Sequence, residues 1–159
     1  MTSTSYDPID TQIKHGRVAM MAVVGILVAE NYHPFYGGLV SGPAVDHFYK
    51  IGRIDPNFWL IPLLVTGIFE AYSIATAWAP RKETKGTVAW LKEDHIPGNL
   101  GFDPLKLGPK GGVGSAAWID MRNKELQNGR LAMMAVAGII AQELVDGKTI
   151  IGHMVGPIL

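Results

Sequence analysis

One segment occurs twice in this chain, and in both copies an arginine comes directly before an apolar run. Lys14 to Glu30 reads KHGRVAMMAVVGILVAE, and Gln127 to Glu143 reads QNGRLAMMAVAGIIAQE. At an offset of 113 residues, ten of the seventeen positions are identical. Two such segments, far apart in one chain, predict a helix pair related by a pseudo-twofold axis, an arrangement that membrane proteins commonly use.

The apolar runs differ in length. Val18 to Ala29 holds twelve uncharged residues and Leu131 to Ala141 holds eleven, whereas Phe58 to Ala79 holds 22 residues with one charge. Crossing a hydrocarbon core of ~30 Å takes about 20 helical residues. The middle run is therefore long enough by itself. The other two reach spanning length only if their helices continue upstream through Arg17 and Arg130.

The middle run has recognisable ends. Asp55-Pro56 is typical of an N-cap followed by proline at the first helical position, and Pro80 is expected to end the helix. Pro62 lies within the first two turns, so the regular helix either starts late or kinks there. Glu70 is the only charged residue in this run.

A soluble helical domain is the alternative to a membrane protein. Runs of eleven or twelve apolar residues are more typical of buried core helices than of membrane spans. However, these runs are apolar around their whole circumference, whereas surface helices of small soluble domains have a polar face. Small residues, the usual means of close helix packing in lipid, recur at Gly16, Ala19, Ala22 and Gly25, mirrored by Gly129, Ala132, Ala135 and Gly138.

We therefore predict an all-α membrane protein with three transmembrane helices, the first and third crossing with pseudo-twofold symmetry. The chain is expected to form a single domain over residues 1–159, with helices at about 8–32, 56–79 and 115–146. Most of the basic residues outside the helices lie in the loop between the second and third helices. By the positive-inside rule, this places that loop and the N-terminus on the cytosol-like side. The first ten residues, MTSTSYDPID, lack the features of a transit peptide, so any such peptide has been removed or lies outside this sequence.

The two arginines need partners, because a charged side chain inside a bilayer costs at least ~2.5–3.5 kcal/mol. Glu125 and Asn128 share one helix face, while Arg130 is rotated about 140° from Glu125 and points toward a partner helix. Pseudo-symmetry then predicts crossed contacts, Arg17 with Glu125 and Arg130 with Gln12, the second being neutral on one side. The alternative is that both arginines extend to the membrane interface at the helix ends.

The polar groups near these arginines are suited to magnesium. A hard cation prefers oxygen and nitrogen donors, and magnesium already held by a macrocycle requires only one axial ligand. A lone histidine or asparagine on an apolar helix is more often simply hydrogen-bonded, but repetition beside Gly-Arg favours ligation. The candidates are Gln12, His15, Glu125 and Asn128, with Gly16 and Gly129 leaving space for a ring.

At these residues the chain resembles the light-harvesting chlorophyll-binding family of thylakoid membranes. The family motif E-x-x-H/N-G-R-x-A-M appears as QIKHGRVAM (residues 12–20) and as ELQNGRLAM (residues 125–133). GFDPLKLGP (residues 101–109) precedes the third helix as it does in the family, and FEAYSIA (residues 69–75) is close to a segment with a chlorophyll-ligating glutamate. The resemblance covers nearly the whole chain.

The resemblance implies three membrane helices, the first and third locked by reciprocal Glu–Arg pairs that involve Arg17 and Arg130. It also implies chlorophylls bound through magnesium and carotenoids in the grooves beside the crossing. By position, the chlorophyll ligands would be His15, Glu70, Glu125, Asn128 and Gln142, with Gln12 at the usual glutamate position and His153 as a weaker candidate. The loop that holds one carotenoid end would include Asp103, Pro104 and Leu105.

Three features depart from the family pattern. Gln12 replaces the first-helix glutamate, so Arg130 faces a neutral amide. Ser73 stands where many members have an arginine, so Glu70 is expected to lack a counter-charge, and an unpaired buried carboxylate tends to be protonated. The upstream FDPL-type loop is missing, because YDPI at residues 6–9 lies too close to the first helix; we interpret Asp7-Pro8 as a helix start.

The phrases PGNLGFDPLKL and AQELVDGKTI look more like the red-lineage antennae, which bind chlorophyll a with or without chlorophyll c and carotenoids of the fucoxanthin or another xanthophyll type. The resemblance implies a non-enzymatic antenna subunit that passes excitation energy to a photosystem. Its place would be the plastid thylakoid membrane, multi-pass, with the N-terminus on the stromal side. Its partners would be the photosystem core, neighbouring antenna subunits and thylakoid lipids. The net charge of zero gives no indication of nucleic-acid binding.

Two rival functions are considered. A photoprotective member of the family would dissipate energy as heat in response to lumenal acidity, but the lumenal acids are expected to be too scattered for sensing: Glu30, Asp46, Asp55, Glu143 and Asp146. A pigment-free membrane transporter or assembly protein would use a polar Arg–Glu core. Hydrolase chemistry has little support, because the Ser, His and acidic residues form no recognisable arrangement.

Overall fold

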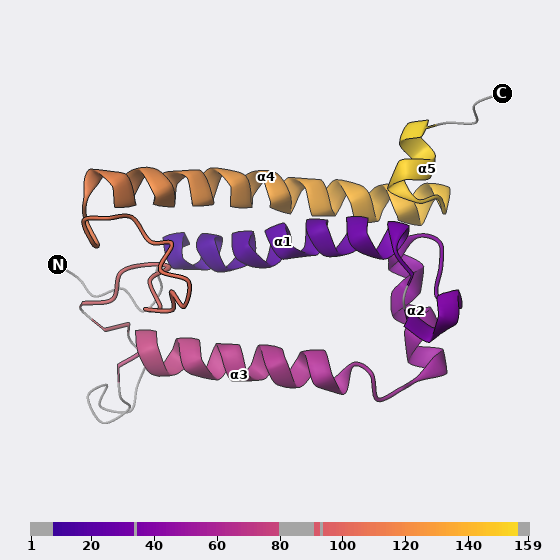
Figure 1. Cartoon of the computed structure of the whole chain (residues 1–159), viewed down its shortest axis with the longest axis horizontal. Coiled ribbons are helices and arrows are strands. Elements are labelled where there is room, and N and C mark those ends of the chain that lie inside the picture. The colour runs from indigo at the N-terminus through magenta and orange to yellow at the C-terminus, as the bar shows by residue number, and fades with distance from the viewer. Residues whose placement is uncertain (1–7, 34, 80–90, 93, 156–159) are drawn as a thin grey trace.

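The computed structural model describes residues 8–33, 35–79, 91–92 and 94–155, and these are organised as helices (Figure 1). The elements in chain order are α1 (Pro8–Asn31), the short turn η1 (Phe35–Gly38), α2 (Ala44–Ile54), α3 (Leu60–Ala77), α4 (Ala116–Asp146) and α5 (Ile150–Val155). A single antiparallel bridge joins Trp78 to Leu91 within the described part. The all-α prediction is confirmed for these residues.

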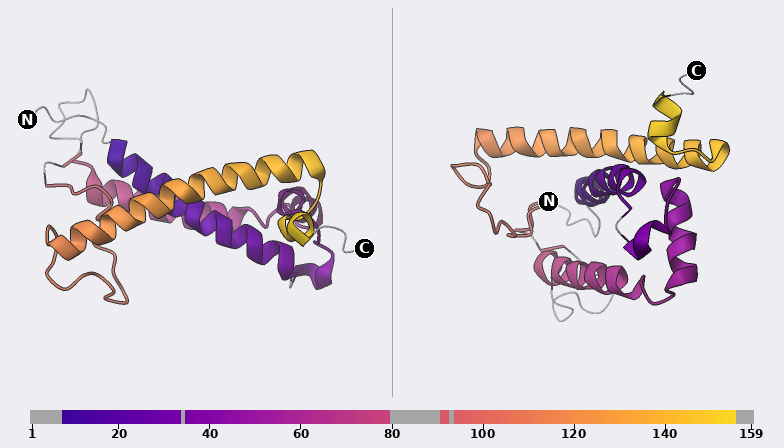
Figure 2. Two further views of the ribbon diagram at one scale, coloured as in Figure 1. Left: turned by 90° about the horizontal axis from the view of Figure 1, so that it is seen from above. Right: turned by 45° about the vertical axis from the view of Figure 1, so that its right-hand side comes forward.

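The long helices α1 and α4 cross face to face through glycine. A Cβ atom built on Gly16 would lie 2.9 Å from the Cα of Gly129, and one built on Gly129 would lie 2.9 Å from the Cα of Gly16. No side chain larger than hydrogen fits at either position without moving a backbone. Figure 2 shows the two helices crossing as an X, so the predicted pseudo-symmetric crossing is present in the structure.

The ends of α4 follow from its sequence. Ser115 is the N-cap and its hydroxyl accepts a hydrogen bond from the backbone N–H of Trp118 at 3.2 Å, which satisfies one of the donors left open in a first turn. Gly147 ends the helix in the left-handed conformation, with φ of 61°. The predicted bounds of the first and third helices, 8–32 and 115–146, agree with α1 and α4 to within one residue. The assignment of Asp7 as an N-cap lies outside the described residues.

The middle helix begins later than predicted. Asp55 is the C-cap of α2 rather than an N-cap of α3, because its N–H bonds to the carbonyl of Ile51 at 2.8 Å. A turn over residues 56–59 follows, and α3 starts at Leu60. Pro62 therefore lies in the first turn, where its missing N–H breaks no helical hydrogen bond. Of the two predicted outcomes for Pro62, the late start is correct; Pro80 lies outside the described residues.

Almost all side chains of helix α3 are exposed. Only Ser73 and Ala77 are buried in it, while large apolar side chains such as Leu63, Leu64 and Ile68 are each at least 60% exposed. It runs beside α1 (Figure 1) but makes no extensive helix–helix contact within the described chain. Such an apolar surface requires lipid or another apolar partner to cover it.

Two of the described helices, α1 and α3, are long and apolar enough to cross a membrane. Helix α4 is longer, with 31 residues, but its first half carries charges such as Asp120, Arg122 and Lys124. That α4 is the third span stays a prediction.

Two short helices were not predicted. Helices α2 and α5 follow α1 and α4 respectively and lie at the same end of the helix pair (Figure 1). Helix α2 is amphipathic and buries His47 and Ile51. Residues 91–92 and 94–115 lie at the opposite end, beside the start of α1.

Candidate functional site

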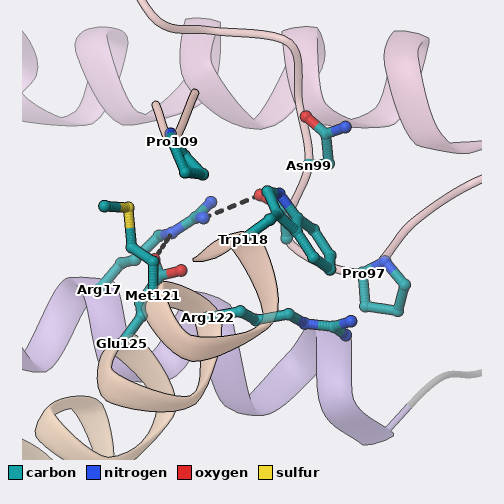
Figure 3. Close-up of a pocket in the computed structure, with 9 residues that line it drawn as sticks. Arg17, Pro97, Asn99, Pro109, Trp118, Met121, Arg122 and Glu125 are labelled. Carbon is teal, nitrogen blue, oxygen red and sulfur yellow. Dashed lines mark hydrogen bonds and ion pairs between the residues drawn. The ribbon is translucent and has the colours of Figure 1, made fainter. Parts of the chain in front are cut away.

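Arg17 is the centre of the contacts between α1 and α4. Its Nε donates to Glu125 Oε1 at 2.7 Å, and its Nη2 donates to the carbonyl oxygen of Gly98 at 2.8 Å (Figure 3). Both charged side chains are about one-third exposed, at 35% and 31%. The predicted Arg17–Glu125 pair is present in the structure.

Arg130 makes the symmetric contact. Its Nη2 donates to Gln12 Oε1 at 2.8 Å, from α4 back to α1. Gln12 stands at the position equivalent to Glu125, so one crossing contact joins two charges and the other joins a charge to a neutral amide. The predicted asymmetry is confirmed.

The loop before α4 is attached to both α1 and α3. Asp10 accepts a hydrogen bond from the N–H of Gly98 at 2.8 Å, and its Oδ1 lies 3.4 Å from Nε2 of the buried His95. The hydroxyl of Tyr72 donates to the carbonyl of Leu100 at 3.1 Å. The loop carbonyl that Arg17 uses is thereby fixed. Sequence reasoning missed Asp10, His95 and Gly98 as parts of the site, because their pairing depends on a long-range contact.

Gly98 allows the loop to approach α1 closely. It has φ of 78°, and a Cβ there would lie 2.8 Å from the Cδ1 of Ile13, the most fully buried large side chain of the described residues. Trp118 and Arg122 line a small cavity of about 130 Å³ on the other side of the ion pair, with the Arg122 guanidinium 5.2 Å from the Trp118 ring centre (Figure 3).

His15 and Asn128 flank the glycine crossing and are both exposed at its outer surface. His15 Nδ1 lies 2.8 Å from the carbonyl oxygen of Thr11, four residues earlier. A carbonyl accepts only from a protonated nitrogen, so this bond places the proton on Nδ1 and leaves the Nε2 lone pair directed away from the helix. Histidines that ligate metals are commonly oriented by such a second bond.

Glu70 has a counter-charge that the sequence did not reveal. Lys14 Nζ of α1 lies 3.5 Å from Glu70 Oε2, so the expectation of an unpaired middle-helix carboxylate was wrong. Lys14 comes from a neighbouring helix, whereas the missing arginine at Ser73 would have come from the same one. Ser73 is 3% exposed and its hydroxyl has no partner.

Gln142 and His153 lie together near the end of α4. The Gln142 amide nitrogen donates to Asp146 at 2.7 Å and lies 3.1 Å from His153 Nε2. The other His153 nitrogen, Nδ1, is 3.3 Å from Asp146 Oδ2. Both ring nitrogens of His153 therefore have protein partners, whereas the amide oxygen of Gln142 is left for another ligand.

The loop carrying Asp103, Pro104 and Leu105 is exposed. Asp103 orders it, accepting hydrogen bonds from the N–H groups of Leu107 at 3.0 Å and Gly108 at 2.8 Å. Asp103 also lines a cavity of about 680 Å³ between α1, α3 and this loop. Pro104 and Leu105 are not in the wall of that cavity, so among these three residues the structure brings Asp103 alone to it.

Two acids from the repeated segments meet at the opposite end of the helix pair. Glu30 accepts hydrogen bonds from the N–H of Ile150, at the start of α5, and Glu143 accepts one at 2.8 Å from the N–H of Val45, in the first turn of α2. The two residues are 7% and 3% exposed and lie next to each other, and Oε1 of Glu143 is buried without a hydrogen-bond partner. The expectation that the lumenal acids are all scattered was wrong for this pair.

Comparison with known proteins identifies the family of this chain. A model of the chlorophyll a-b binding protein family matches residues 10–144, and the chain belongs to that family, which consists of all-α membrane proteins. The predicted family is confirmed.

Named relatives include stress-related proteins as well as antennae. The chain is 42% identical over 151 residues to light-harvesting complex stress-related protein 1 of Chlamydomonas reinhardtii, covering 92% of this chain and 56% of that protein. It is 39% identical over 141 residues to a fucoxanthin-chlorophyll a-c binding protein of Isochrysis galbana, covering 88% and 64% respectively. The latter likeness is consistent with the predicted red-lineage type.

A green-plant relative is more distant. The chain is 28% identical over 170 aligned residues to a chlorophyll a-b binding protein of Petunia hybrida, covering 92% of this chain and 56% of that protein. The chain therefore spans between about half and two thirds of the length of these relatives.

Proposed function

We propose that this chain is a light-harvesting subunit of the plastid thylakoid membrane that binds chlorophylls and carotenoids and passes excitation energy to a photosystem. The observation that carries the proposal is the glycine crossing, where a charge-locked helix pair presents His15 and Asn128 outward beside Gly16 and Gly129. Bound pigments supply light absorption and excitation transfer; the chain supplies their positions and orientations.

The proposed chlorophyll ligands each keep a donor atom after their protein contacts are made. Glu125 uses Oε1 for Arg17, which leaves Oε2, and Gln12 uses one lone pair of its amide oxygen for Arg130. His15 keeps Nε2 and Gln142 keeps its amide oxygen. The full set that we propose is Gln12, His15, Glu70, Glu125, Asn128 and Gln142. We leave His153 out, because both of its nitrogens are engaged.

The cavities around α1 fit flat, apolar pigments. One of about 1080 Å³ lies between α1, α2 and the turn before α3, and one of about 680 Å³ lies between α1, α3 and the loop of Asp103. The first is at the upper end of the ~300–1,000 Å³ typical of ligand pockets. Their walls are mostly apolar side chains, with Met20 and Met21 in both. We propose that carotenoids and chlorophyll rings fill these spaces.

We infer the topology from the two ends of the helix pair. The start of α1 lies with the described residues of 91–92 and 94–115, and α2 and α5 lie at the opposite end (Figure 1). We place the first end in the stroma and the second in the lumen, with α1, α3 and α4 crossing the membrane between them. Neighbouring antenna subunits, a photosystem core and lipids would cover the exposed apolar surface of α3.

Refolding of the purified chain with chlorophyll a and carotenoids tests the proposal. A light-harvesting complex should form with defined stoichiometry, and exciting the carotenoid band should produce chlorophyll fluorescence. His15→Phe should lose one chlorophyll while keeping most others, and Val18→Phe, on the same helix and exposed to 63% without a polar role, serves as control. A folded but colourless protein would favour the pigment-free alternative.

A second candidate function, photoprotective dissipation, is favoured by the buried Glu30–Glu143 contact and by the 42% identity to a stress-related protein. Both carboxyl groups hold the starts of the short helices, Glu143 that of α2 and Glu30 that of α5, so their protonation would couple this junction to lumenal acidity. Fluorescence lifetimes at pH 5 and pH 7.5 distinguish the two functions: strong shortening at pH 5 indicates dissipation. Glu143→Gln, which replaces a titratable carboxyl with an amide of the same shape, should remove that pH dependence. Asp46→Asn, at the exposed end of α2, should keep it.

A further inference from the structure

The cavity between α1 and α2 contains buried polar atoms that have no protein partner. Nε2 of His47, Nε2 of His33 and Nε1 of Trp59 are all buried without a hydrogen bond, and all three residues line this cavity of about 1080 Å³. A buried polar group without a hydrogen-bond partner destabilises the folded chain. Three in one otherwise apolar cavity indicate a ligand with complementary groups.

His47 is held so that its lone pair is available. It lies on α2 and is 7% exposed, with the backbone of Gly42 beside its ring. Its Nε2 is buried without a hydrogen-bond partner, and in the tautomer that carries the proton on Nδ1 this nitrogen has a free lone pair. Burial lowers the pKa of His47, which keeps the ring neutral and its Nε2 able to bind a metal.

The surroundings of His47 exclude a free metal ion or a group of water molecules as the occupant of the cavity. His33 packs edge-on against His47 with ring centres 5.9 Å apart, but the described residues form no cluster of three or more His, Cys, Asp or Glu that could hold a free metal ion. The rest of the wall is apolar, including Val24, Ile26 and Phe48, so a group of water molecules would have few partners. A metal already held by a macrocycle needs only one axial ligand.

Trp59 supplies the second complementary group. Its indole N–H can only donate, and its ring packs against Phe48 with centres 4.6 Å apart. The cavity therefore offers one lone pair and one N–H to a large apolar molecule with an electrophilic centre and a peripheral acceptor.

We propose that this cavity binds a magnesium tetrapyrrole of the chlorophyll type, with His47 Nε2 as axial ligand and the Trp59 N–H donating to a peripheral carbonyl. This site is additional to the ligands on α1, α3 and α4, and it rests on the proposed function as a pigment-binding protein. His33 holds the His47 ring in place rather than acting as a ligand. The short helix α2, on the lumenal side, would then bind a pigment as well as connect α1 to α3.

The test uses the full 159-residue chain refolded with chlorophyll a and carotenoids. His47→Phe should lose one chlorophyll per polypeptide with the other pigments retained, and His47→Gln, which restores an axial oxygen, should recover it. His33→Phe should keep the full number. Trp59→Phe should also keep it, but resonance Raman should show one carbonyl band moved to higher frequency.

The outcomes separate this site from the general function. Wild-type chain that binds no pigment would overturn the proposed function. Wild-type chain that binds pigment, together with a His47→Phe variant of unchanged stoichiometry and absorption, would overturn the site alone. Loss of the chlorophyll in His33→Phe with retention in His47→Phe would show that His33 is the ligand, and would also overturn the proposed His47 site. If His47→Phe does not fold, an unchanged carbonyl band in Trp59→Phe decides against the site.

Discussion

The glycine crossing allows the sharpest test of the fold, because α4 contains two glycines of the repeated segment, Gly129 and Gly138, in different surroundings. A Cβ on Gly129 would lie 2.9 Å from the Cα of Gly16, whereas a Cβ on Gly138 meets nothing within 4 Å. Gly129→Ala therefore forces the α4 backbone away from the α1 backbone, while Gly138→Ala adds a methyl group in open space. Both substitutions gain the same helix propensity, so their difference isolates the steric effect.

The magnitude follows from the geometry. Restoring ordinary contact at 3.4–4 Å requires the helices to separate by about 0.5 to 1 Å at the crossing. The Arg17–Glu125 and Arg130–Gln12 contacts, at 2.7 and 2.8 Å, would then exceed the range of good hydrogen bonds. Overpacking of this kind costs about 1–3 kcal/mol.

Heat-induced release of pigment from the refolded complex measures this difference. In a chain of this length, 1 kcal/mol corresponds to a change of ~2–4 °C in Tm, so Gly129→Ala should melt several degrees below Gly138→Ala. Circular dichroism of both variants at low temperature controls for helix content. Equal melting midpoints would refute the reasoning, because they would show that the two backbones do not meet at Gly129.

Further predictions concern charges. Arg17→Leu should reduce the yield of pigmented protein more than Arg130→Leu, since Arg17 loses a charged partner and a carbonyl while Arg130 loses only a neutral amide; equal yields would contradict this. Lys14→Gln should weaken retention of the chlorophyll at Glu70 by removing its cation, measured as pigment stoichiometry, while Lys50→Gln should not. The lowered pKa of His47 means that the unfolded chain binds more protons below about pH 6.5, so stability should fall with acidification by at most ~1.4 kcal/mol per pH unit. In His47→Phe this part of the slope should be absent from Tm measured against pH.

Much of the helix pair could be predicted because its determinants are local and repeated. The Gly-Arg step before each apolar run indicated both the crossing and its asymmetric contacts, since Gln12 and Glu125 occupy matched positions. The ends of α4 are also set by local features, the N-cap Ser115 and the left-handed Gly147.

What could not be predicted depends on contacts between distant segments. The counter-ion of Glu70 comes from Lys14, which is 56 positions earlier, and the loop carbonyl for Arg17 is fixed by Asp10. Helix α2 was missed because it is short and its apolar face is completed only by other elements. Its cap, Glu143, lies 98 residues away.

The two carboxylates at the lumenal end have a consequence for how the molecule is built. Glu30, which closes the first copy of the repeat, holds the short helix that follows the second copy, and Glu143 does the converse. Each half thus bonds the short helix of the other half. This is the arrangement of a self-complementary dimer, here contained within one polypeptide. The start of each short helix is bonded by an acid of the other half, so each half stabilises the other, and their connection through α3 keeps the two in one chain.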